Sequence, residues 1–282
     1  MRFLWHGSAS YTLQLGGRCF LVDPHFSRAG DYGAWYVANL KAPAVSEYLT
    51  AIQPDWVLIT HSHFDHFDLR TVRQLVDHSR AQFVGPPEVT RVIARSFGAE
   101  PQRLWPLDPG GWAELPVNGG QLILRAHAGV HWLTGEEGEA EALRLASKRD
   151  VYGLFPCGGA MLSYELRWEN GAGRGLSVYL TGDTELSGIP KGPVRADVMV
   201  ANVGDLMMHP VRKLPAKAMM SPEEAAVAAG WLGAGWVIPV HWDFPGFLRP
   251  LTYPVVAARF HGQKPRARLV EPMPGRWVEI PA

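Results

Sequence analysis

Cysteine is scarce in this sequence, with only Cys19 and Cys157 among 282 residues. Two cysteines cannot build a disulfide framework or a thiolate zinc cage, and they fit a reducing compartment. Neither sign of charge is in excess, because 27 lysines and arginines face 27 aspartates and glutamates. Such a balance gives no electrostatic reason to expect nucleic acid or an anionic membrane as the main partner, and it leaves local basic clusters open. We therefore expect no nucleic-acid partner and a cytoplasmic location.

Long apolar runs are also missing. The longest, Ala225 to Val240, is interrupted by glycines and Pro239 and is shorter than the roughly 20 residues that a transmembrane helix needs. At the N-terminus, polar His6 and Ser8 come before the apolar region of a signal peptide could form. No transmembrane segment is expected. Hydrophobic residues make up 47% of the sequence, and it contains no repeat or linker, which predicts one globular domain over residues 1–282.

Strand-like and helix-like patterns alternate along the chain, which predicts an α/β fold. Asp68 and Ser221 are typical helix N-caps, and Gly98 is typical of a helix end. The loops expected to carry specificity are 26–45, 132–150 and 243–254. The expected elements are a hairpin within residues 11–22, strands over 54–60 and 82–85, further strands within 113–127 and 160–182, a strand over 235–240, and helices over 69–76, 88–97 and 222–232.

A cluster of histidines follows the predicted strand at 54–60. The segment reads Thr60-His-Ser-His-Phe-Asp-His-Phe-Asp68, and its three histidines and one aspartate would arise in this order by chance about 0.0007 times in a chain of this composition. A loop leaving a strand can direct His61 and His63 at one metal ion while Asp65 and His66 reach a second. Imidazole and carboxylate are ligands that suit zinc and its neighbours.

Three further segments place histidine or aspartate where an apolar strand ends. They contain His131, Asp183 and His241, in Val130-His131-Trp132, Thr181-Gly182-Asp183 and Val240-His241-Trp242. Strand ends are where α/β proteins build their sites. Two ordinary interpretations stay open: Asp183 as a turn residue and His241 as a strand-end histidine of the core.

These motifs, in this order, resemble the metallo-β-lactamase superfamily. The similarity extends from about residue 2 to 245, and it is greatest to the branch that holds N-acylphosphatidylethanolamine phospholipase D and ascorbate-6-phosphate lactonase. The resemblance implies a four-layer αβ/βα sandwich, in which two mixed β-sheets are flanked by helices. It also covers Ser221-Pro222-Glu223-Glu224 and Pro239-Val240-His241-Trp242. The family's usual Gly-His at the end of its first strand is replaced by His6-Gly7.

The same resemblance implies two metal sites. Asp183 would bridge them, and Asp23 would support the histidine loop without binding metal. The ligands implied for the first metal are His61, His63 and His131, and those for the second are Asp65, His66 and His241.

The expected chemistry is hydrolysis. Two divalent ions, Zn²⁺ or alternatively Mn²⁺, would lower the pKa of a bridging water and provide a hydroxide that attacks an ester-type bond, with phosphodiester or lactone favoured. Asp65 or His241 could then direct a proton, so the catalytic candidates are Asp65, Asp183 and His241. The expected partner is a small-molecule substrate, which a C-terminal group of basic residues could recognise if it contains phosphate. The sequence leaves open whether the chain forms a homo-oligomer.

Two other functions are weighed against a hydrolase. A di-iron oxidoreductase of this fold would have glutamate in place of His63, and no flavin-binding segment follows. A non-catalytic or nucleic-acid-acting metal-binding protein would lack a ligand or have a basic face. The sequence favours the hydrolase but does not identify the leaving group.

One choice among the histidines rests on strand periodicity. In a strand through Leu124 and Ala126, the alternation places His127 on the opposite face, whereas Gly129 can end the strand and leave His131 in a loop. We therefore assign the ligand to His131 and a core or rim position to His127. The other histidines are taken as structural or solvent-facing, although His25 and His209 lie in loops that could line the cleft, and Trp242 is taken as a packing residue.

Overall fold

The computed structural model describes residues 1–28, 30–31, 37–117, 119–131, 160–173, 175–209, 213–249 and 251–281. The expected loop at 132–150 lies outside these residues, as does part of the loop at 26–45. Trp132 and Cys157 also lie outside them. Among the described residues, no helix combines the length and apolar character needed to cross a membrane.

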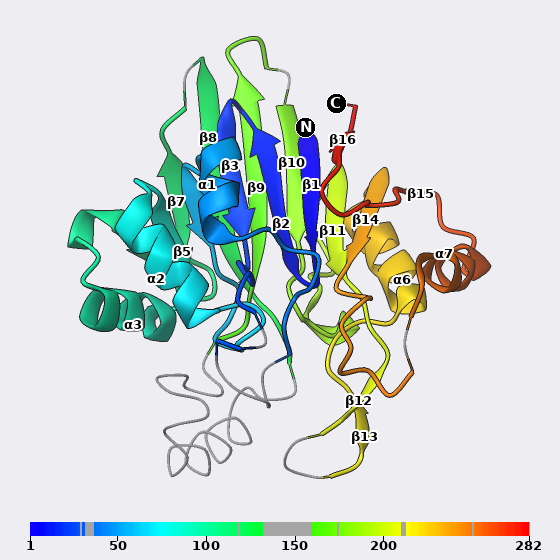
Figure 1. Cartoon of the computed structure of the whole chain (residues 1–282). Helices are drawn as coiled ribbons and strands as arrows, with labels where there is room; N and C mark the ends of the chain where they lie inside the picture. The colour runs from blue at the N-terminus through cyan, green and yellow to red at the C-terminus, as the bar shows by residue number, and fades with distance from the viewer. Residues whose placement is uncertain are drawn as a thin grey trace.

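Two seven-stranded sheets form the centre of the fold (Figure 1). The first sheet has the order β16 (Trp277–Glu279), β1 (Arg2–Gly7), β2 (Ser10–Leu15), β3 (Arg18–Val22), β4 (Trp56–Leu58), β5 (Gln82–Gly85) and β6 (Leu104–Pro106). The second has the order β15 (Arg268–Leu269), β14 (Trp236–Val240), β11 (Val198–Asn202), β10 (Gly175–Leu180), β9 (Leu162–Asn170), β8 (Gly120–Ala128) and β7 (Trp112–Leu115). A separate hairpin pairs β12 (Leu206–Met208) with β13 (Pro215–Lys217).

Both sheets are mixed. In the first, β16, β1, β2 and β3 pair antiparallel, and β3 to β6 pair parallel. In the second, β7 to β10 pair antiparallel, and β10, β11, β14 and β15 pair parallel. The two chain termini lie close together because β16 pairs with β1 (Figure 1).

Helices cover the outer faces of the two sheets (Figure 1). The first sheet packs against α1 (Val45–Ala51), α2 (Leu69–His78) and α3 (Pro87–Phe97), and the second against α6 (Pro222–Leu232) and α7 (Tyr253–Gly262). Within the described residues there are also two short 3₁₀ turns, η1 (Pro101–Arg103) and η2 (Leu186–Gly188). The expected four-layer sandwich is confirmed.

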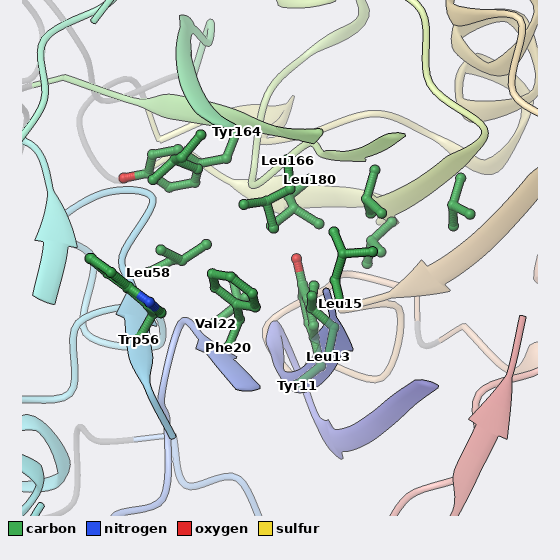
Figure 2. Close-up of a cluster of buried hydrophobic side chains, with 14 of the residues drawn as sticks. Tyr11, Leu13, Leu15, Phe20, Val22, Trp56, Leu58, Tyr164, Leu166 and Leu180 are labelled. Carbon is green, nitrogen blue, oxygen red and sulfur yellow. The ribbon is translucent and has the colours of Figure 1, made fainter. Parts of the chain in front are cut away.

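The main core lies between the sheets. Figure 2 shows aromatic and aliphatic side chains of β2, β3 and β4 facing those of β9 and β10. The Tyr164 hydroxyl donates to the carbonyl oxygen of Ile59 at 2.7 Å, which ties β9 to the end of β4 across the core. Leu122, Leu124 and Ala126 of β8 are buried in this core, as the strand alternation predicts.

Local sequence signals explain several helix boundaries. Asp68 accepts hydrogen bonds from the backbone amides of Arg70 and Thr71 and so caps α2. Ser221 caps α6 in a capping box with Glu224. Gly98 ends α3 in the left-handed conformation, where φ is +70°.

The pairing brings four strand ends to one edge of the sandwich. Because β9 is antiparallel to both β8 and β10, these two strands run in the same direction, and β14 runs parallel to them through β11. The backbone amide of Leu162 donates to the carbonyl oxygen of Thr60 at 2.9 Å and joins the end of β4 to this edge. Side chains that follow β4, β8, β10 and β14 are therefore neighbours.

Candidate metal centre

All seven side chains predicted as ligands come together at this edge. Four belong to the turn between β4 and α2, and the others follow β8, β10 and β14. Six are buried and His63 is half-buried. Their ligand atoms form three groups within 4.8 Å: His61, His63 and His131; His61, His66 and Asp183; and Asp65, His66 and His241.

The first group is made of three imidazoles. His63 Nδ1 lies 2.9 Å from His61 Nε2 and 3.0 Å from His131 Nε2. The rings of His61 and His131 are each oriented by a contact at Nδ1, the nitrogen that faces away from His63. His61 Nδ1 lies 2.9 Å from Thr60 Oγ1, and His131 Nδ1 donates to the carbonyl oxygen of Ala218. Since Thr60 Oγ1 donates its proton to Asp23, it accepts from His61 Nδ1. The Nε2 lone pairs of both rings therefore point toward His63.

Beyond the first group, the imidazoles of His66 and His241 lie against the carboxylates of Asp65 and Asp183. His241 Nε2 lies 3.2 Å from Asp65 Oδ2 and 3.7 Å from Asp183 Oδ2. His66 Nε2 lies 3.2 Å from the same Asp183 oxygen. Asp183 is thus shared with His61 on one side and with His241 on the other, which is the position that a bridging ligand requires.

Asp23 supports the histidine turn from beneath. Its carboxylate accepts hydrogen bonds from the Thr60 amide at 2.8 Å, from Thr60 Oγ1 at 2.9 Å and from His66 Nδ1 at 2.7 Å. Donation from Nδ1 leaves the lone pair of His66 Nε2 directed at Asp65 and Asp183. This is the supporting role that the family resemblance implied for Asp23.

The pKa values of the histidines shift in opposite directions on the two sides of the centre. Burial lowers the pKa of His63 to about 3 and that of His61 well below 6.5, so both rings are neutral. Burial alone would raise the pKa of Asp183, but the charges of His241 and His66 outweigh it and hold that pKa well below its usual value. The same carboxylate raises the pKa of His66 against the effect of burial.

Divalent cations fit this donor set. His66 Nε2 and His241 Nε2 are buried, and each lies 3.2 Å from a carboxylate oxygen without the geometry of a hydrogen bond. A buried imidazole lone pair beside a buried carboxylate is costly unless a proton or a cation lies between them. Three converging neutral imidazoles and a carboxylate between two groups are donors typical of zinc and similar ions.

Sequence reasoning assigned no role to three residues that orient the ligands, namely Thr60, Asn202 and Ala218. Asn202 Nδ2 donates to Asp183 Oδ1 at 2.8 Å and leaves Oδ2 facing the histidines. Asn202 is the last residue of the apolar strand β11, so the strand-end pattern that identified Asp183 could have identified it. Ala218 contributes through its backbone carbonyl, so its side chain could not indicate this role in the sequence. His25, taken as structural, is buried and lines a cavity beside the centre.

Other histidines and aromatic residues lie elsewhere. His127 Nε2 lies 3.2 Å from Glu165 Oε2, and its ring packs 5.6 Å from that of Tyr179. His127 belongs to none of the three groups. Trp242 packs against Trp5, with ring centroids 5.1 Å apart, as its interpretation as a packing residue predicts.

Replacing Asp23 by Asn is expected to weaken metal binding about 10- to 100-fold, because the amide does not supply the charge that holds His66 Nδ1. Titration of metal against a competing chelator measures this affinity. Asp55→Asn is the control. The Asp55 carboxylate also accepts from a strand backbone, the Cys19 amide at 2.8 Å, but it precedes β4, whereas the candidate metal centre follows that strand. Equal affinity in both variants would contradict the supporting role.

Comparisons with known proteins agree with this fold. Residues 18–242 match a family described as the beta-lactamase superfamily domain. A relative named UPF0173 metal-dependent hydrolase, from Pyrobaculum aerophilum, is 26% identical over 87% of this chain and 86% of its own. An isothiocyanate hydrolase from Delia radicum gut bacteria has a similar fold, with a TM-score of 0.67 and 19% identity over the full length of both chains. CmlA, a diiron β-hydroxylase from Streptomyces venezuelae, gives a TM-score of 0.62 at 14% identity, over 99% of this chain and 54% of its own.

Proposed function

Since this chain belongs to the beta-lactamase superfamily, we propose that it is a dinuclear metal-dependent hydrolase acting on an ester-type bond of a small molecule. The observation that carries the proposal is the convergence of seven buried or half-buried ligand groups, with Asp183 Oδ2 between two histidine sets. Relatives named metal-dependent hydrolases support it.

Each residue has a separate task in this proposal. His61, His63 and His131 would hold one ion, and Asp65, His66 and His241 would hold the other. Asn202 Nδ2 donates to Asp183 Oδ1 and so orients the carboxylate, whose Oδ2 would be available to both ions.

When bound, the two ions would lower the pKa of water and neutralise negative charge developing on the attacked group. Asp65 Oδ2, which lies 3.2 Å from His241 Nε2, is placed to hold a proton that passes to the leaving group. Phosphodiesters and lactones are the bonds proposed. Zn²⁺ is the proposed metal, with Mn²⁺ as the alternative.

The other functions are less well supported. The residue at position 63 is histidine and its Nδ1 lies at the centre of the first group, which does not fit the glutamate expected of a di-iron oxidoreductase. Arg259, one of the C-terminal basic residues, is paired with Glu223 at 2.7 Å and Asp205 at 3.2 Å, so its charge is already neutralised. A single domain and a cytoplasmic location stay proposals.

Metal analysis tests this function first. Protein purified without chelator is expected to contain close to two divalent ions per chain, since the two groups offer separate ligand sets. Activity against a panel of chromogenic phosphodiesters, lactones and nitrocefin should be lost on chelation and return with metal. A reproducible content near zero in folded protein would contradict the proposal.

A further inference from the structure

A cavity of about 190 Å³ lies beside the candidate metal centre, and none of the seven predicted ligands lines it. Phe244 forms part of its wall and connects it to the centre. The Phe244 ring packs 5.2 Å from the ring of His241, and its amide donates to the His241 carbonyl at 3.1 Å. A group bound in the cavity would therefore contact Phe244, which itself contacts the predicted ligand His241.

Ser8 connects the cavity wall to the metal centre through its backbone. Its carbonyl accepts from the His241 amide at 3.0 Å and from Trp5 Nε1 at 2.9 Å, and its own amide donates to Asp243 Oδ1 at 3.0 Å. These contacts hold Ser8 at a φ of +49° and His241 at a φ of +69°. Both the amide and the carbonyl of Ser8 therefore have hydrogen-bond partners.

The Ser8 hydroxyl is not used in this way. Ser8 is 4% exposed and lines the cavity, and its Oγ has no hydrogen-bond partner among the residues that the structure describes. Asn39, also in the wall, is engaged: its Nδ2 donates to the carbonyls of His6 and Gly7 at 3.1 and 3.0 Å. A buried hydroxyl without a partner is costly, and a ligand atom would satisfy it.

Charge in the wall is balanced. Lys41 Nζ lies 2.7 Å from Asp243 Oδ2, so these two groups neutralise each other. The Lys41 ammonium is also held over the rings of Trp5 and Trp242, at 4.9 and 5.2 Å from their centroids. The lysine is therefore fixed in a neutral pair and does not supply a net charge to a ligand.

We propose that this cavity is a substrate subsite that binds a compact uncharged group and that Ser8 Oγ hydrogen-bonds its polar atom. Its volume accommodates about six water-sized groups, since a water occupies about 30 Å³ in the liquid. This inference rests on the proposed hydrolase function and refines it. Lactones and neutral carboxylic esters, which carry no charge, fit such a subsite better than phosphodiesters, whose non-bridging phosphate oxygens carry a negative charge.

A matched pair of small probes tests the subsite without turnover. Cyclopentanone and cyclopentylammonium each have six non-hydrogen atoms, but only the first is uncharged with a carbonyl acceptor. Binding to the metal-loaded protein is measured by ligand-observed NMR. We expect cyclopentanone to bind in the millimolar range and cyclopentylammonium at least several-fold more weakly.

Variants locate the binding. Ser8→Ala and Ser8→Gly, of which the glycine suits the positive φ, should each raise the Kd of cyclopentanone about fivefold while leaving the metal content at the wild-type value. Ala38→Leu should abolish binding by filling the cavity. Ser10→Ala is the control, because Ser10 Oγ is also buried and unpartnered among the described residues but does not line the cavity.

The outcomes separate this proposal from the proposed function. Wild-type affinity in both Ser8 variants, an equal loss in Ser10→Ala, or tighter binding of the ammonium probe would overturn the subsite. Absence of hydrolysis with Ser8-dependent binding of cyclopentanone would overturn the hydrolase and leave the subsite standing. Lactone hydrolysis with no binding in the cavity would do the reverse.

Discussion

Asp183→Asn is expected to lower the hydrolytic rate at least about 1,000-fold, equivalent to about 4 kcal/mol of transition-state stabilisation, and to remove one metal ion per chain. The reason is charge. Asp183 Oδ2 lies 3.2 Å from His66 Nε2 and 3.7 Å from His241 Nε2, and an amide placed there cannot bridge two cations with a negative charge.

The substitution should have little effect on the fold. The Oδ1 atom of asparagine can still accept from Asn202 Nδ2, and its new amide group can donate to the lone pair of a neutral His66. We expect the free energy of unfolding of the metal-free protein to change by less than about 1 kcal/mol. Metal content, steady-state rate and melting temperature are measured on the same preparation.

Asn202→Ala provides a graded comparison. It removes the donor at 2.8 Å from Asp183 Oδ1 but leaves the carboxylate charge, so a smaller loss of rate is expected than in Asp183→Asn. If Asp183→Asn keeps full turnover and two ions, Asp183 is a turn residue and the bridging assignment is wrong.

Much of this site could be predicted because its signals are local. His61, His63, Asp65 and His66 lie within six residues, and their spacing alone indicates two metal sites. The caps at Asp68 and Ser221 act within three residues of each helix start, which is why both helices were predicted close to their observed bounds.

Contacts between distant segments could not be predicted in the same way. Ser8 and Asp243 are separated by 235 residues, and their pairing depends on how β1 and β14 meet at the edge of the sandwich. The helix α1 also escaped prediction, because Ala44 at its N-cap has no capping side chain and the cap comes from Glu47 reaching back to the Ala44 amide. Such partners are determined by tertiary packing, not by local pattern.

The two histidines near the end of β8 allow a second decisive experiment. His127 lies within the strand, directly opposite Ser163 of β9, and points away from the core toward Glu165. His131 follows the strand and is 4% exposed, and its Nε2 lies 3.0 Å from His63 Nδ1. The Ala218 carbonyl accepts from His131 Nδ1 and so leaves Nε2 as the only nitrogen of this ring that can bind a metal.

His131→Ala is therefore expected to lose the first-site ion, with a metal content near one per chain, and at least about 100-fold in rate, which corresponds to about 2.7 kcal/mol. His127→Ala should keep two ions and at least part of the rate. Because this change leaves the buried Glu165 carboxylate without its imidazole, His127→Gln serves as a companion that retains a donor and should restore any lost stability. Metal counts on the purified variants decide the assignment, and one ion in His127→Gln with two in His131→Ala would transfer the ligand role to His127.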